Sequence, residues 1–235
     1  MRDTANRRAR IAGEGIGAPA ELAAFIDHTV LGLEASDRDV AQACDDALRY
    51  GFAAVCVREK QLGGVVRRLG DRGGPLPIAV ADFPRGDGTM AGRAEEVRRL
   101  VGTGAREVDV VFPLPALTSR RYVDALRDLE AVVQAARAVP VKVILETGSL
   151  TVAEKGAASA IAKAAGAAWV KTSTGFGAGG ATEEDVSLLR ALVGEDVGVK
   201  ASGGIRTAAD ALRMVRAGAS RIGSSASVAI VTGKP

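Results

Sequence analysis

Three of the chain's seven lysines lie within short apolar segments, where charged side chains are unusual. They are Lys142 in VKVILE, Lys171 in WVKT and Lys200 in VKAS, and Asp109 has a similar place in EVDVV. Two neighbouring, partly desolvated lysines lower each other's pKa, so that one of them offers a neutral amine to a carbonyl carbon. A carboxylate beside them can exchange the protons that this chemistry moves. The four residues therefore predict an amine-dependent aldolase.

Alternation within these segments predicts where the charged side chains point. Successive residues of a strand face opposite sides, so Lys142 and Glu146 share one face of VKVILE and its valines share the other. The same reasoning directs Asp109, Lys171 and Lys200 inward. A purely structural alternative for Lys142 is a salt bridge with Glu146 in the floor of the sheet. That alternative is weaker for Lys171 and Lys200, which lie near the C-terminal ends of their segments, where barrel enzymes carry out chemistry.

The elements that must position these residues are eight apolar segments and seven amphipathic stretches. The apolar segments, which predict strands, are 25–31, 53–57, 77–83, 107–112, 140–146, 169–174, 198–202 and 221–225. Apolar spacing predicts helices over 37–50, 61–69, 89–101, 121–138, 151–165, 182–193 and 207–217. Strand–helix alternation implies parallel pairing, and eight such units fit a single-domain (β/α)8 TIM barrel over residues 19–235. The alternative is an open doubly wound sheet, but no Gly-x-Gly-x-x-Gly loop follows the first segment.

Three glycine-rich loops follow the later segments. They are 172–180, 202–207 and 223–225. Glycine lets backbone N–H groups approach oxygen atoms, and a helix N-terminus adds a favourable partial charge. Each loop alone is compatible with an ordinary turn. Because many barrels bind phosphate with the loops after their seventh and eighth strands, we expect a phosphate site in the last two.

The supply of metal ligands and nucleophiles is small. His28 is the only histidine, and the two cysteines, Cys44 and Cys56, are separated. Since a zinc-dependent aldolase needs about three nitrogen ligands, we expect neither a metal nor another cofactor. If Asp27 and Thr29 face the barrel interior, His28 faces the helices and is a packed histidine, not a hydrolase base. Two cysteines are too few for a disulfide framework, which favours a cytoplasmic protein.

The net charge of +3 comes from 31 Lys and Arg against 28 Asp and Glu. The first ten residues alone account for it, with four arginines and Asp3, so the rest of the chain does not favour nucleic acid. Aromatic residues make up 3%, too few for base-stacking platforms. No apolar run reaches the ~18 residues of a membrane span, and we expect no secretory signal because the N-terminus lacks a suitable apolar region. We expect residues 1–18 to form a disordered tail.

The sequence resembles the deoxyribose-phosphate aldolase family over about residues 26–225. The matching stretches, of which the last two are the most specific, are IDHT (26–29), VCV (55–57), DFPRG (82–86), EVDVV (107–111), VKVILET (141–147), VKTSTGF (170–176) and VKASGGIRT (199–207). The resemblance implies reversible cleavage of 2-deoxy-D-ribose 5-phosphate to D-glyceraldehyde 3-phosphate and acetaldehyde. It implies that Lys171 forms a Schiff base, that Lys200 lowers its pKa and that Asp109 shuttles protons. The residues implied to contact the substrate are Asp27, Thr29, Cys56, Thr172, Gly203, Gly204, Gly223 and Ser225. The resemblance also implies a possible homodimer.

The chain departs from the family pattern after Val57 and after Ser225. Arg58 and Glu59 follow Val57 where the family commonly has Asn-Pro, and Ala226 stands where some relatives have a second serine. Other hypotheses remain open from the residues alone. They are a Schiff-base aldolase or transaldolase for a different sugar phosphate, an inactive barrel that binds a phosphorylated ligand, and a nucleic-acid binder that uses the arginine tail.

Overall fold

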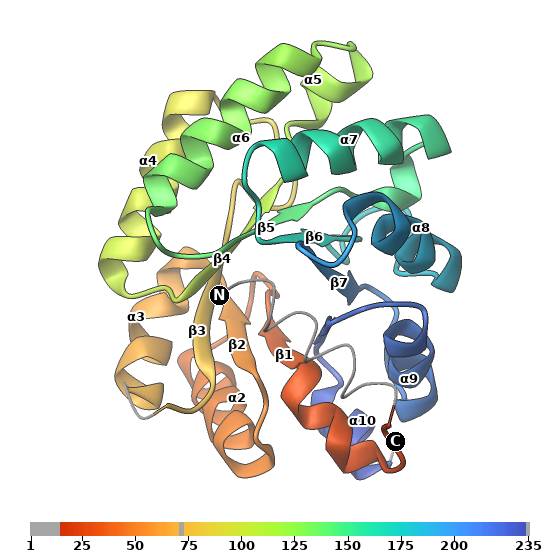
Figure 1. Ribbon diagram of the computed structural model, residues 1–235. Helices are drawn as coiled ribbons and strands as arrows, with labels where there is room; N and C mark the ends of the chain where they lie inside the picture. Colours follow the sequence, from red (N-terminus) through yellow and green to blue (C-terminus); the bar gives the residue numbers. More distant parts are fainter. Residues whose placement is uncertain (1–14, 71–72, 234–235) are drawn as a thin grey trace.

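Eight parallel strands close into a barrel, with helices around the outside (Figure 1). The computed structural model describes residues 15–70 and 73–233. The strands are β1 (Ile26–Val30), β2 (Ala54–Val57), β3 (Leu76–Ala81), β4 (Glu107–Val111), β5 (Val141–Ile144), β6 (Trp169–Lys171), β7 (Gly198–Ser202) and β8 (Arg221–Ser224). Each strand pairs with its neighbours in sequence, and β8 pairs with β1, so the sheet closes on itself. The predicted (β/α)8 barrel is confirmed.

Seven helices match the predicted amphipathic stretches to within a few residues. They are α2 (Asp37–Tyr50), α3 (Glu59–Leu69), α4 (Met90–Thr103), α6 (Tyr122–Ala136), α7 (Val152–Ala164), α8 (Glu183–Val193) and α9 (Ala208–Arg216). Thr182 and Thr207 accept hydrogen bonds from the backbone at Asp185 and Asp210 and so cap the N-termini of α8 and α9. Local sequence signals therefore decide where these helices begin.

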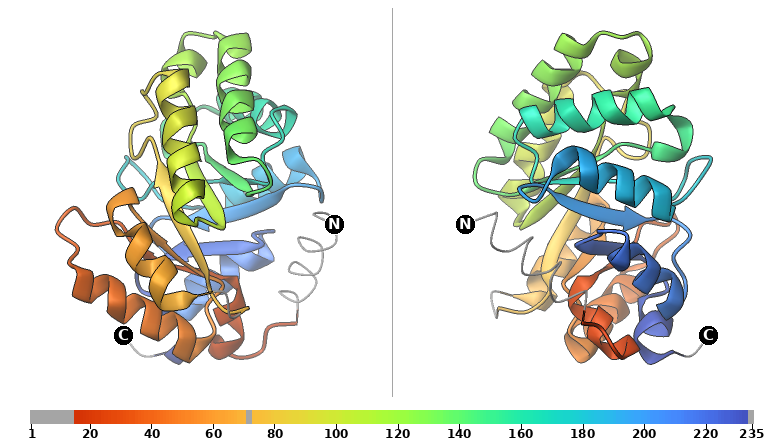
Figure 2. Two further views of the ribbon diagram at one scale, coloured as in Figure 1. Left: turned by 90° about the vertical axis from the view of Figure 1, so that its left-hand side faces the viewer. Right: turned by 45° about the vertical axis from the view of Figure 1, so that its right-hand side comes forward.

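Four short elements were not predicted. They are η1 (Pro19–Phe25), α5 (Leu114–Thr118), η2 (Thr147–Ser149) and α10 (Ser227–Thr232). Segments this short span too few turns to show a helical period. The turned views in Figure 2 show η1 beside α10, and these two elements contact each other. The tail predicted over residues 1–18 lies mostly outside the described residues.

The apolar core occupies two places. The larger part lies between the sheet and the helices and includes outward-facing valines such as Val108, Val143 and Val170. The smaller part fills one side of the barrel interior with Leu31, Ala54, Cys56, Ile78 and Val80, from the loop after β1 and from β2 and β3. The remaining interior, toward β4–β8, holds buried charged side chains. Among the described residues, no helix is both long and apolar enough to span a bilayer.

Candidate active site

Asp109 on β4 lies at the centre of the charged half of the barrel. Its Oδ1 accepts a hydrogen bond from Lys142 Nζ at 3.0 Å, and its Oδ2 accepts from Lys171 Nζ at 3.0 Å and Lys200 Nζ at 2.7 Å. All four side chains are buried. The register explains the grouping, because Asp109 pairs with Lys142 across β4 and β5, and Lys171 pairs with Lys200 across β6 and β7. The predicted inward direction of these side chains is confirmed.

The alternative of a salt bridge between Lys142 and Glu146 is wrong, and so is the expected inward direction of Glu146. Strand β5 ends at Ile144, and Glu146 has a left-handed backbone with φ of 58°, so the alternation does not continue to it. The Glu146 carboxylate instead accepts hydrogen bonds from the Thr174 backbone N–H, at 3.2 Å, and from the Thr174 hydroxyl. Lys142 contacts the carboxylates of Glu107 and Asp109. Glu146 thus anchors the loop after β6.

The two facing lysines differ in acidity. Burial lowers the pKa of Lys171, and the positive charge of Lys200 lowers it further, against the attraction of Asp109. Burial acts in the same direction on Lys200, but the carboxylates of Asp109 and Asp27 outweigh it and raise the pKa of that lysine. The predicted mutual lowering is therefore right for Lys171 and wrong for Lys200. Lys171 is the amine that gives up its proton more readily.

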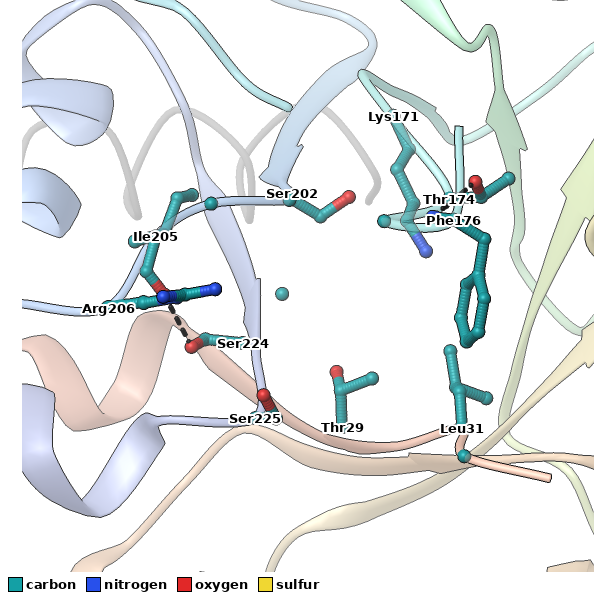
Figure 3. A pocket seen from close by; sticks show the side chains of 15 residues that line it. Thr29, Leu31, Lys171, Thr174, Phe176, Ser202, Ile205, Arg206, Ser224 and Ser225 are labelled. Carbon is teal, nitrogen blue, oxygen red and sulfur yellow. Dashed lines mark hydrogen bonds between the residues drawn. The ribbon is translucent and has the colours of Figure 1, made fainter. Parts of the chain in front are cut away.

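A cavity of about 280 Å³ opens beside Lys171 at the C-terminal ends of the strands (Figure 3). Lys171 and Phe176 lie on one side of this cavity, and Arg206 and Ser225 lie on the opposite side. Thr29 forms part of the wall between the two sides. The cavity is therefore a short passage from a buried amine to two glycine- and serine-containing loops.

The loop after β7 is shaped for close backbone contact. Gly203 and Gly204 have φ of 90° and 79°, values that residues with a side chain rarely adopt. A Cβ on Gly203 would also lie 2.9 Å from the Gly180 Cα of the neighbouring loop. The loop leads into α9, so its backbone N–H groups and the helix N-terminus favour an anionic group at this side of the cavity.

Comparison with known proteins identifies the family. A family model described as DeoC/LacD family aldolase matches residues 22–233. The chain belongs to this family of aldolases. A deoxyribose-phosphate aldolase of Staphylococcus haemolyticus is 46% identical over 211 residues, which cover 90% of this chain and 96% of the relative. The resemblance inferred from the motifs is thereby confirmed.

Solved structures agree with this assignment of the aldolase. A crystal structure from Coccidioides immitis, provisionally ascribed to deoxyribose-phosphate aldolase, is 38% identical, with a TM-score of 0.88 and coverage of 97% of both chains. A tetrameric deoxyribose-phosphate aldolase from Aeropyrum pernix is 32% identical, with a TM-score of 0.85 and 97% coverage of both chains. Both similarities extend over nearly the whole barrel.

The predicted site residues of the aldolase fall into two groups. Those that line the cavity are Lys171, Thr29, Gly203, Gly204, Gly223 and Ser225. Those that lie beneath or behind its wall are Asp109, Lys200, Asp27, Cys56 and Thr172. Their roles stay predictions. Within the described ranges, no cluster of His, Cys, Asp and Glu is arranged to hold a metal ion.

Three of the predicted substrate contacts do not reach the cavity. Asp27 is fully buried and pairs with Lys200 at 2.5 Å. Cys56 belongs to the apolar side of the barrel interior, and burial raises its pKa to about 11. The Thr172 hydroxyl donates to the Ser202 carbonyl and accepts from the Ser202 N–H, each at 3.0 Å, and so joins the ends of β6 and β7. Each of the three therefore supports the site from outside the cavity.

His28 lies where the sequence predicts it. Its Nδ1 is 2.9 Å from the Ser227 hydroxyl, and its ring centroid is 5.4 Å from that of Phe52. Burial lowers the pKa of His28. The histidine therefore packs on the outer face of β1, as the sequence predicts.

Several residues near the cavity were not singled out from the sequence. Leu31, Thr174, Phe176, Arg206 and Ser224 also line it. Thr174, Phe176 and Arg206 lie within the motifs that carry the family resemblance, and Ser224 lies in the glycine-rich loop 223–225. A motif or a loop does not show which of its side chains face a cavity. Glu107 is a charged residue inside the barrel that the sequence analysis missed. Its inward direction could have been predicted, because it stands two residues before Asp109 on the same strand and so shares its face.

Proposed function

We propose that this aldolase cleaves 2-deoxy-D-ribose 5-phosphate reversibly to D-glyceraldehyde 3-phosphate and acetaldehyde, through a Schiff base on Lys171. The observation that carries the proposal is that Lys171 extends from the buried charge cluster to the wall of the cavity. The loops across the cavity suit a phosphate, and the relative from Staphylococcus haemolyticus bears the name of this activity. The substrate then lies with its aldehyde at Lys171 and its phosphate at the opposite loops.

The reaction begins with the neutral amine of Lys171. Its nitrogen attacks the aldehyde carbon C1 of the open-chain sugar, and loss of water leaves a protonated imine. The lowered pKa of Lys171 supplies the neutral amine, while Asp109 lies 3.0 Å away to take up a proton that leaves the nitrogen. The pKa of Asp109 lies well below its usual range, against its burial, because the three lysine charges hold the carboxylate ionised. It therefore starts the cycle as a proton acceptor.

Carbon–carbon cleavage then uses the imine as an electron sink. The C3 hydroxyl loses its proton to a base, the C2–C3 bond breaks, and its electron pair forms the C1–C2 double bond of an enamine. The C3 fragment leaves as D-glyceraldehyde 3-phosphate. Protonation at C2 and addition of water to C1 release acetaldehyde and return Lys171 as the free amine. The nearby Asp109 carboxylate stabilises the cationic imine throughout.

The phosphate end of the substrate is held by backbone and side-chain donors together. Backbone N–H groups at Gly203 and Gly204, the Ser225 hydroxyl and the Arg206 guanidinium line that side of the cavity. Among the described residues, no carboxylate forms a side-chain ion pair with Arg206, so its charge is available to a phosphate. Because a charge-assisted contact is stronger than a neutral one, this end supplies binding energy that orients the aldehyde.

The decisive experiment traps the Schiff base. Borohydride added with acetaldehyde should attach a two-carbon unit to Lys171, located by peptide mass spectrometry, and Lys171→Met should remove this label. Lys155→Met is the control, because Lys155 pairs with Asp185 on the helical layer. Labelling elsewhere, or none, would overturn the assignment. Acetaldehyde release from 2-deoxy-D-ribose 5-phosphate tests the substrate, and release of a product only from another sugar phosphate would favour the alternative aldolase or transaldolase.

Absence of a metal, a cytoplasmic location and a homodimer stay predictions. A chelator should leave the cleavage rate unchanged, since every group invoked above belongs to the chain. The relative from Aeropyrum pernix is a tetramer, so assembly of some kind is also worth testing. Sedimentation at several protein concentrations would distinguish a monomer, a dimer and a tetramer.

A further inference from the structure

Six side chains, five of them buried and Arg221 partly buried, form a closed ring of contacts across the barrel, beneath Lys171. Carboxylates and cations alternate around this charge ring, whose members in order are Glu107, Lys142, Asp109, Lys200, Asp27 and Arg221. They come from β4, β5, β7, β1 and β8. With three carboxylates and three cations, the charge ring is electrically balanced.

Two lysines of the charge ring each bridge two carboxylates. Lys142 contacts Glu107 and lies 3.0 Å from Asp109. Lys200 lies 2.7 Å from Asp109 and 2.5 Å from Asp27. Taking either ammonium away would leave two carboxylates with one cation fewer between them. Such uncompensated buried charge is costly, so both lysines are held in the charged form.

Arg221 closes the charge ring at the base of the barrel. It lies 2.7 Å from Asp27 and 3.4 Å from Glu107, and its guanidinium carbon lies 5.6 Å from the centroid of the Trp169 ring. Lys142 Nζ lies at the same distance from that ring centroid. Gly198 makes room for the indole, since a Cβ there would lie 1.9 Å from it. The indole thus contacts two cations of the charge ring and fixes Arg221 away from the cavity.

Lys171 lies outside the charge ring, whose charges already sum to zero without it. Among the described residues its single carboxylate contact is Asp109 Oδ2, at 3.0 Å, and the same oxygen accepts from Lys200 at 2.7 Å. With Lys171 protonated, four cations face three carboxylates inside the barrel. The excess positive charge disappears when Lys171 loses its proton. At low effective dielectric constant this electrostatic difference is large.

We propose that Arg221 and Glu107 are positioning residues that keep Lys171 neutral by balancing the charge ring, although neither lines the cavity. The inference rests on the proposed function, which requires a neutral amine. Without the charge of Arg221, three carboxylates face two ring cations, and a protonated Lys171 restores the balance. Without the charge of Glu107, the excess positive charge grows, and Lys171 loses its proton at a lower pH. The two changes should therefore act in opposite directions.

Within residues 15–70 and 73–233, no other charge inside the barrel replaces this control. The charged and titratable groups around Lys171 inside the barrel are the six members of the charge ring and Cys56 of β2. Glu146, after β5, instead accepts from Thr174 in the loop after β6, and the Arg206 guanidinium lies on the opposite side of the cavity. Strand β3 presents the apolar Ile78 and Val80. Outside, α7 packs on β6, and its Lys155 and Lys163 pair with Asp185 and Asp196. The thiol of Cys56, with its raised pKa, is uncharged at neutral pH.

The experiment follows the reactivity of the Lys171 amine as a function of pH. Its rate of acylation by acetic anhydride, measured by peptide mass spectrometry, gives the pH midpoint for loss of the proton. Relative to the unsubstituted chain, Arg221→Gln should raise the midpoint and Glu107→Gln should lower it, each by about one pH unit or more. The double variant should return close to the original midpoint. Arg213→Gln, an exposed arginine of α9, is the control and should leave it unchanged.

The proposal would be overturned if both single variants kept the original pH midpoint of Lys171 or shifted it in the same direction. It would also be overturned if the double variant did not return close to the original midpoint. Circular dichroism verifies that each variant is folded. If Arg221→Gln does not fold, Lys142→Met removes a ring cation in its place and should also raise the midpoint. If neither folds, Glu107→Gln decides, and an unchanged or raised midpoint refutes the proposal. A failure of the proposed function is recognised separately, because the unsubstituted chain would then form no borohydride adduct with acetaldehyde.

Discussion

Lys171 and Lys200 donate to the same carboxylate oxygen, Asp109 Oδ2, at 3.0 Å and 2.7 Å. Lys200 has a second carboxylate, Asp27, at 2.5 Å, whereas Lys171 has no second one in the part of the chain that the structure describes. The two amines therefore differ in electrostatic support although they lie side by side on β6 and β7. On this asymmetry rests our proposal that Lys171 is the nucleophile and Lys200 the permanent cation.

The first prediction concerns pH. The cleavage rate should rise with pH as Lys171 loses its proton, because only the neutral amine attacks the substrate. Lys200→Met should move this rise to higher pH by about one unit or more, since a neighbouring positive charge is lost. The free energy of unfolding should fall by about 3 kcal/mol, because Asp27 and Asp109 lose a buried partner. Rate profiles and urea unfolding measure the two effects, with the exposed Lys60→Met as control. A rise at an unchanged pH would exclude this role of Lys200.

The second prediction concerns phosphate binding. Arg206→Gln should raise the KM for the phosphorylated sugar about tenfold, which corresponds to the loss of a contact worth about 1.4 kcal/mol. The KM for unphosphorylated 2-deoxyribose should stay the same. Arg213→Gln removes the same charge from the exposed side of α9, where Arg213 pairs with Glu183 and Asp210, and should change neither value. Equal effects of Arg206→Gln on both sugars would place the phosphate elsewhere.

The third prediction concerns the rim of the cavity. Phe176 is 53% exposed, packs edge-on against Phe83 with ring centroids 5.4 Å apart, and has the Arg58 guanidinium 5.7 Å from its ring centroid. Phe176→Ala should reduce the free energy of unfolding by only about 1 kcal/mol, since its packing is partial. It should nevertheless raise turnover of bulkier acceptor aldehydes severalfold, because the passage widens. Leu192→Ala, an exposed apolar residue of α8, is the matched control. An unchanged preference among aldehydes would show that Phe176 does not limit acceptor size.

The fourth prediction concerns stability alone. Arg93 is fully buried, 3.0 Å from Asp82, 3.1 Å from Asp128 and 2.5 Å from the Val111 carbonyl oxygen. Arg93→Met should lower the free energy of unfolding by about 3–5 kcal/mol at pH 7, because two partly buried carboxylates lose their cation. The pH dependence of cleavage should not move. Arg98→Met, which breaks an exposed pair with Glu95, should cost less than about 1 kcal/mol.

The decrease in the free energy of unfolding caused by Arg93→Met should also depend on pH. Burial raises the pKa of Asp82 and of Asp128 even with Arg93 present, and removing the arginine raises both further. A carboxyl group whose pKa is raised on folding stabilises the fold below its unfolded pKa and loses that contribution as pH rises through the folded value. The destabilisation measured in urea should therefore be smaller near pH 4 than at pH 7. An equal loss at both values would mean that packing, not charge, explains it.

The sequence by itself determined that four charged side chains, those of Asp109, Lys142, Lys171 and Lys200, enter the barrel. Alternation within a strand is local, so the valines beside Lys142, Lys171 and Asp109 fix the inward side without knowledge of the rest of the chain. The helix caps and the strand–helix alternation are local signals too, and they led to the closed barrel. The same rule failed at Glu146, because where a strand ends depends on its partners as well as on its own residues.

Only the tertiary structure decided which charges meet. Asp27 and Arg221 are 194 residues apart in sequence, yet barrel closure pairs β1 with β8 and brings them to 2.7 Å. Strand register and tilt also determine that Lys200 has two carboxylates and Lys171 has one. The acidity of each lysine depends on the number of opposite charges within a few ångströms. That number is a property of the closed sheet, which no segment of the sequence contains alone.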